Sequence, residues 1–141
     1  MIRDMRISSR RFLSIAAVLM LLEAILHTIG NLLPVTDPAL IALEKSMRGY
    51  HFDMSMNPSM FDAHMTLVLM MTITFAALGI LNLVLAAAPD LPQRLLRRTI
   101  WVNIVWVAGS VALSWFYGIA PPLICGIVVE VPLIGALLSR N

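Results

Sequence analysis

Four long apolar stretches constrain this sequence more than any other feature. They cover about residues 12–33, 58–88, 99–118 and 122–138, and a helix needs roughly 20 mostly apolar residues to cross a bilayer. Only 13% of the residues are charged, against about 25% in a soluble domain. We therefore predict an all-α integral membrane protein, a single transmembrane domain over residues 1–141 that forms a four-helix bundle.

Positive charges flank these stretches unevenly. The connection 34–57 carries Lys45 and Arg48 among several acidic residues, whereas the other flanks are basic. The basic residues of those other flanks are Arg3, Arg6, Arg10, Arg11, Arg94, Arg97, Arg98 and Arg140. The positive-inside rule then predicts that both termini are cytoplasmic and that 34–57 is external, in a multi-pass protein of a bacterial inner membrane. Because these charges set topology, no nucleic-acid partner is expected.

The external connection has helix signals of its own. Asp37 followed by Pro38 is typical of an N-cap with proline in the first turn, and Gly49 suits a helix end. We predict one short extra helix between them. Asn57 and Pro58 repeat the cap-and-proline pattern and predict the start of the second span.

Glu23 and His27 lie inside the first apolar stretch, four residues apart and therefore on one helix face. The stretch exceeds the apolar core of a signal peptide and lacks a following small-residue cleavage site, so we expect it to be retained. A charged residue at mid-bilayer costs roughly 2.5–3.5 kcal/mol on insertion scales. Such residues indicate a functional site by default.

Other spans carry polar residues at about the same depth in the membrane as Glu23 and His27, if residues are counted inward from each predicted membrane surface. Glu130 of the fourth span falls near Glu23, and His64 of the second span falls near His27 if that helix begins at Pro58. We predict that Glu23, His27, His64 and Glu130 form one catalytic constellation. The helical spacing of the second and third spans predicts a substrate-binding lining made of Asn103, Trp106, Ser110, Tyr117, Met71 and Phe75.

Acid–base chemistry on a lipophilic small molecule is the function that this pattern favours. A carboxylic acid held neutral by apolar surroundings donates a proton, and a second carboxyl or an imidazole takes one back. Isomerisation or cyclisation of a terpenoid, sterol or polyketide-like substrate fits such a site. The expected partners are that substrate and membrane lipids, and the sequence leaves homo-oligomer formation open.

Three other interpretations remain open. The acids and imidazoles suit a proton relay in a transporter or in an accessory subunit of a membrane complex. His27 and His64 suit a haem or a metal ion, although no metal-specific spacing accompanies them, and we expect no cofactor and no metal. The acids also suit an internal polar clamp that sets helix register.

Methionine is concentrated between residues 47 and 71, where seven of the ten methionines lie. Thioethers beside imidazoles suit Cu(I). They also make an adaptable apolar lining for a varied ligand, or simply contact the membrane, and we favour these two interpretations over copper.

Overall fold

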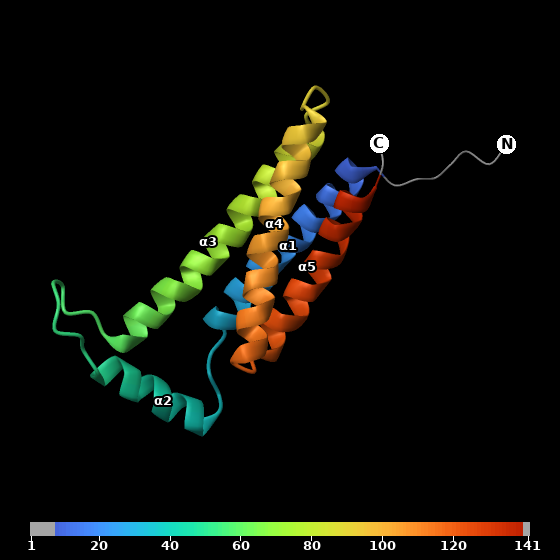
Figure 1. Ribbon diagram of the computed structural model, residues 1–141. Coiled ribbons are helices and arrows are strands. Elements are labelled where there is room, and N and C mark those ends of the chain that lie inside the picture. Colours follow the sequence, from blue (N-terminus) through green and yellow to red (C-terminus); the bar gives the residue numbers. More distant parts are fainter. Residues whose placement is uncertain (1–7, 140–141) are drawn as a thin grey trace.

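The computed structural model describes residues 8–139, which form five α-helices and no strand. The helices are α1 (Ser9–Leu32), α2 (Pro38–Gly49), α3 (Met60–Ala87), α4 (Gln93–Phe116) and α5 (Ala120–Leu138). All but α2 are long and apolar enough to cross a membrane, so the chain has the four spans of a helical membrane bundle (Figure 1). Arg3, Arg6 and Arg140, which the topology argument used, lie outside the described residues.

Three predicted helix starts are corrected. The first span begins at Ser9 rather than Phe12, because Ser8 accepts a hydrogen bond from the Arg11 amide. The third span begins at Gln93 rather than residue 99, so that α4 includes the basic residues Arg94, Arg97 and Arg98. The second span begins at Met60 rather than Pro58, with Ser59 as its N-cap.

A capping box explains that last shift. The Asp62 amide donates to the Ser59 hydroxyl, while the Asp62 carboxylate accepts from the Ser59 amide. This reciprocal pair satisfies two helix-end donors at once. Asn57, the predicted cap, instead lies in the turn before the helix with a positive φ of 45°.

Glycines bring the helices close together. A Cβ atom added at Gly79 of α3 would lie 2.8 Å from the Leu21 side chain of α1, and one at Gly135 of α5 would lie 2.9 Å from Phe12. One at Gly126 of α5 would lie 2.6 Å from Val111 of α4. Small residues at these contacts let backbones approach, which is how helices associate in lipid. In this way α1 packs against α3 and α5, and α4 packs against α5.

Polar contacts close the end of the bundle where α1 begins and α5 ends (Figure 1). The Ser9 and Ser139 hydroxyls lie 2.8 Å apart and join α1 to α5. The Arg10 guanidinium donates to the carbonyls of Ala88 and Pro89 at the C-terminal end of α3. A cation there also complements the helix dipole. We call this the closed end.

Apolar side chains fill the bundle next to the closed end. Leu13, Leu96, Ile100 and Leu133 are each fully buried there. Elsewhere many large apolar side chains face outward, including Leu67, Ile73, Val105 and Val131. That outer surface suits contact with lipid tails.

The opposite end is open. There α3 diverges from α4, and α2 lies across the gap between the end of α1 and the start of α3 (Figure 1). α2 has no buried residue and packs against α3. Arg48 of α2 lies 3.6 Å above the Phe61 ring of α3, a cation–π contact that fixes this end of α2.

Candidate functional site

A buried amide pair joins α3 to α4 inside the bundle. The Asn82 and Asn103 side chains donate to each other over 2.9 and 3.1 Å, and Asn103 also donates to the Thr99 carbonyl. Both residues are almost fully buried. Sequence reasoning placed Asn103 in the substrate-binding lining. In the structure its amide is committed to a contact between helices, which is a packing role.

An aromatic pair lies farther from the closed end than the pair of buried amides does. Phe75 of α3 and Trp106 of α4 meet edge to face, with ring centroids 5.0 Å apart. Phe75 is buried, and Trp106 is partly buried. The structure therefore brings together two residues of the predicted lining.

Glu23 lies on α1, the helix that packs against both α3 and α5. The Glu23 Oε2 atom is buried and has no hydrogen-bond partner among the described residues. An unpaired buried polar atom is costly and points to a function.

Glu130 of α5 has the same unusual feature. Its Oε2 atom is buried and lacks a hydrogen-bond partner in the described part of the chain. The antiparallel helices α1 and α5 place Ser9 beside Ser139 and Phe12 beside Gly135. In this register Glu130 lies about five residues, or roughly 8 Å along the bundle, nearer the closed end than Glu23. The two acids therefore occupy neighbouring levels of one bundle.

His27 faces α3, one turn beyond Glu23. Its Nδ1 atom lies 3.1 Å from the Thr72 hydroxyl, and Thr28 donates to that hydroxyl over 3.3 Å. Asn31 donates to the His27 carbonyl over 2.7 Å. The Thr72 hydroxyl of α3 thus orients the imidazole.

His64 lies apart from His27, contrary to the predicted depth. Since Thr72 is the residue of α3 beside His27, His64 is eight residues farther along α3, about 12 Å away along the helix axis. The first turns of α3 extend past the end of α1 at Leu32. The depth count assumed that both helices end at the same level, and the extra length of α3 removes that match.

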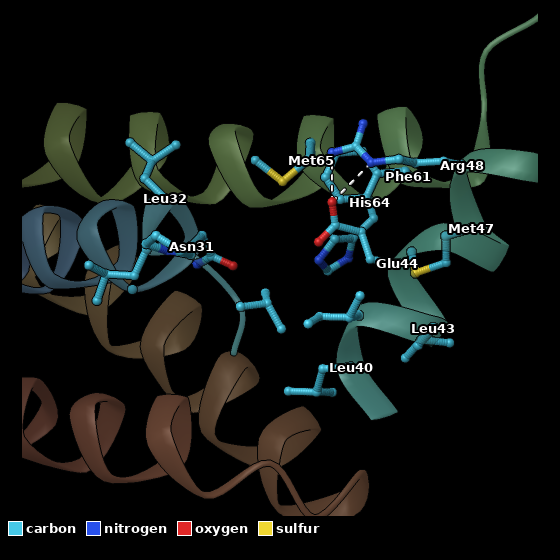
Figure 2. Close-up of a pocket in the computed structure, with 15 residues that line it drawn as sticks. Asn31, Leu32, Leu40, Leu43, Glu44, Met47, Arg48, Phe61, His64 and Met65 are labelled. Carbon is cyan, nitrogen blue, oxygen red and sulfur yellow. Dashed lines mark hydrogen bonds and ion pairs between the residues drawn. The ribbon is translucent and has the colours of Figure 1, made fainter. Parts of the chain in front are cut away.

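His64 instead lines a cavity at the open end, which we call the α2 cavity. The cavity measures about 620 Å³ and lies between the end of α1, α2 and the start of α3 (Figure 2). Its wall is mainly apolar, and the polar side chains in it are those of Asn31, Glu44, Arg48 and His64. Arg48 donates to Glu44 Oε1 from two nitrogen atoms, at 2.9 and 2.7 Å.

The other predicted lining residues lie elsewhere. Ser110 is partly buried and donates to the Trp106 carbonyl of its own helix. Met71 is 39% exposed on α3, and Tyr117 is 68% exposed just beyond the end of α4. Of the methionine-rich segment, Met47 and Met65 line the α2 cavity, and Met56 is 96% exposed.

The haem or metal alternative rested on His27 and His64. Residues 8–139 contain no group of three or more His, Cys, Asp or Glu side chains able to hold a metal ion. The separation of His27 from His64 along α3 also prevents both from ligating one iron in this arrangement. No step is therefore assigned to a haem or a metal ion.

Sequence reasoning missed Thr72 and the Glu44–Arg48 pair. The i,i+4 spacing of Glu44 and Arg48 on a predicted helix was a usable signal for their ion pair. Thr72 gave no such signal, because a threonine in an apolar helix usually bonds to its own backbone.

Comparison with models of protein families, with curated proteins and with solved structures finds no match to this chain. The chain's own geometry therefore carries the functional proposal.

Proposed function

We propose that this protein performs acid–base chemistry, of the isomerisation or cyclisation type, on a lipophilic small molecule inside the membrane. Glu23 and Glu130 are its acid and base, and His27 orients or relays a proton. In this proposal both termini are cytoplasmic, α2 is external, and the protein belongs to a bacterial inner membrane.

One observation carries the proposal: the two buried carboxyl oxygens lack partners within the described chain. Glu23 and Glu130 are partly buried side chains, whereas the fully buried amides of Asn82 and Asn103 form a reciprocal pair. A clamp that sets helix register needs groups that bond across helices, as these amides do. Glu23 Oε2 and Glu130 Oε2 make no such bond to residues 8–139. Their burial therefore supports a role toward a bound molecule better than a role in packing.

The chemistry needs no net supply of protons. One carboxyl donates a proton to a carbon atom of a substrate double bond, and the other group accepts a proton from a neighbouring carbon. The positive character that develops in between is stabilised by aromatic faces. We assign that role to Phe75 and Trp106, whose rings meet edge to face inside the bundle.

The closed end favours this chemistry over proton-coupled transport. A relay across the membrane requires polar groups along the whole path. Between the acids and the closed end, the bundle is filled by buried apolar side chains such as Leu13, Ile100 and Leu133. The α2 cavity lies at the open end. Access from one side suits an enzyme whose substrate enters and leaves by the same route.

The test replaces Glu23 or Glu130 by Gln in cells that naturally carry the gene. Lipid extracts of wild-type, deletion and variant cells are compared by chromatography and mass spectrometry. We expect one lipophilic component whose retention differs between wild-type and deletion cells at unchanged mass, and both variants should resemble the deletion. Extracts of wild-type composition from both Gln variants, at matched protein levels, would refute the assigned roles.

A further inference from the structure

The helix α2 directs its apolar face at a cavity rather than at packed protein. Leu40, Ile41 and Leu43 line the α2 cavity and remain 49–55% exposed. The opposite face carries Ala42, Lys45 and Ser46, which do not line it. Apolar surface left unburied in this way is unfavourable, at roughly 25 cal/mol per Å². A helix arranged like this indicates a site that an apolar molecule fills.

We propose that the α2 cavity binds a neutral lipophilic alcohol, whose hydroxyl donates its one hydrogen bond to Glu44. One part of this proposal rests on the proposed function, namely that the bound alcohol is the substrate of Glu23 and Glu130. Binding in the α2 cavity is a separate statement with its own test.

Hydrogen-bond acceptors dominate the polar part of the cavity. Glu44 Oε1 accepts both Arg48 donors, which leaves Glu44 Oε2 for a ligand. Asn31 uses its Nδ2 on the His27 carbonyl, and its side-chain oxygen is left over. In Figure 2 the Glu44 carboxyl and the His64 ring lie at the same part of the cavity. A carboxylate acceptor beside an imidazole matches a hydroxyl group, which both donates and accepts.

The charges in the cavity favour a neutral ligand over an anion. The Arg48 guanidinium is paired with Glu44 at 2.7 Å and stacked on the Phe61 ring at 3.6 Å. The Glu44–Arg48 ion pair itself carries no net charge. A carboxylate or phosphate would have to displace Glu44 from Arg48 and would meet its negative charge.

The apolar remainder of the cavity fits the body of such an alcohol. Its volume of about 620 Å³ falls within the roughly 300–1,000 Å³ of small-molecule sites. Met47 and Met65 contribute flexible thioether side chains to the wall. Such side chains adapt to different apolar shapes. The cavity adjoins α1 at Asn31, eight residues or about 12 Å along the helix axis from Glu23, so a substrate bound there must move inward along α1 to reach the acids.

The test uses photoactivatable geranylgeraniol, together with the matching carboxylic acid and the matching hydrocarbon, on the full chain in liposomes. We expect the alcohol to label peptides from residues 30–35 and 61–65 about tenfold more than the other two probes, as one hydrogen bond to a charged group predicts. Equal labelling by the hydrocarbon would overturn alcohol recognition, because it would show that any apolar chain fills the cavity.

Two substitutions on α2 provide a matched pair. Leu40→Trp places an indole in the cavity and should abolish specific labelling, while Ala42→Trp on the opposite face should leave it unchanged. Equal labelling of both variants would place the bound probe outside the cavity and refute the proposal.

Glu44→Gln reverses the preference. The substitution removes the negative charge and leaves Arg48 without its ion partner. Labelling by the carboxylic acid should then exceed labelling by the alcohol. An unchanged preference for the alcohol would exclude Glu44 as the group that selects a neutral ligand.

The two proposals fail separately. Glu23→Gln should retain alcohol labelling of the α2 cavity, since Glu23 does not line it. Absence of labelling in the wild type, together with loss of lipid conversion in Glu23→Gln, would refute the α2 cavity and leave the acid–base function intact.

Discussion

At the scale of single residues, the polar groups inside the bundle divide into paired amides and unpaired acids. Asn82 and Asn103 exchange hydrogen bonds between α3 and α4. Glu23 and Glu130 each bury a carboxyl oxygen that makes none within the described chain. This difference separates structural from functional roles and is open to measurement.

Stability measurements should therefore distinguish the two classes. Asn82→Leu removes both interhelical bonds, and we expect the free energy of unfolding to fall by about 1–2 kcal/mol. Glu23→Gln and Glu130→Gln keep the side-chain volume and lose no hydrogen bond of the buried oxygen, so changes should stay within about 0.5 kcal/mol. Unfolding in mixed detergent micelles measures both. A loss in Glu23→Gln as large as that in Asn82→Leu would make Glu23 part of the packing.

Glycine contacts give a second prediction at this scale. In Gly79→Ala the new Cβ meets Leu21 at 2.8 Å and the Ala17 carbonyl at 3.0 Å, so α1 and α3 must separate, at a cost of about 1–3 kcal/mol. Gly109→Ala is the control, because nothing lies within 4 Å of its new Cβ. Equal stability of the two variants by the same unfolding measurement would show that α1 and α3 do not approach closely at Gly79.

At the scale of helices, hydropathy located the four spans, but it did not place their ends or their register. The predicted spans overlap α1, α3, α4 and α5 because about 20 apolar residues in a row have few alternatives. The start of α3 depends on which residue caps the helix. Ser59 and Asp62 form the capping box, and Asn57 lies before it with a positive φ.

How far one helix is shifted along its neighbour explains which predicted site residues lie together in the structure and which do not. Glu23 and Glu130 stood out because of their cost in an apolar helix, and the structure places both inside one bundle at neighbouring levels. His64 was misplaced because its depth depends on how far α3 extends past Leu32. That extension follows from packing at Gly79 and from the contact of Thr72 with His27, which no single-helix pattern contains.

Arg10 makes the next prediction, at the level of whole elements. Its guanidinium holds the last carbonyls of α3 and the following turn, including those of Ala88 and Leu91. Arg10→Ala should lower the free energy of unfolding by about 1.5–3 kcal/mol and speed hydrogen exchange in residues 85–92.

Arg11→Ala is the matched control for this experiment. Arg11 is exposed, and its removal changes the topology-setting charge by the same amount. Similar exchange rates in the two variants would show that Arg10 acts through its charge alone rather than through the closed end.

At the scale of the whole molecule, the bundle is closed at one end and open beneath α2 at the other (Figure 1). The first and last helices meet at the closed end through Ser9 and Ser139. In our proposal, the substrate reaches the acids from the open end, where the α2 cavity lies. In our proposal, the basic residues near the closed end set its orientation in the membrane.

Cysteine labelling tests that orientation. Cys125 is the only cysteine, so a Cys125→Ser background accepts a single reporter. With a membrane-impermeant maleimide, Ser46→Cys on α2 should react in intact cells, and Asp90→Cys between α3 and α4 should react only after permeabilisation. The reverse pattern would place α2 in the cytoplasm.

The central claim is that the buried acids move protons onto and off a lipophilic molecule. Incorporation of solvent deuterium tests this claim even while the substrate is unidentified. The purified chain is placed in liposomes made from the lipids of deletion cells, in deuterium oxide, and the lipids are then analysed by mass spectrometry. Our account predicts that one component gains carbon-bound deuterium with the wild-type chain and not with Glu23→Gln or Glu130→Gln. Equal incorporation by all three proteins, or none by the wild type, would contradict it.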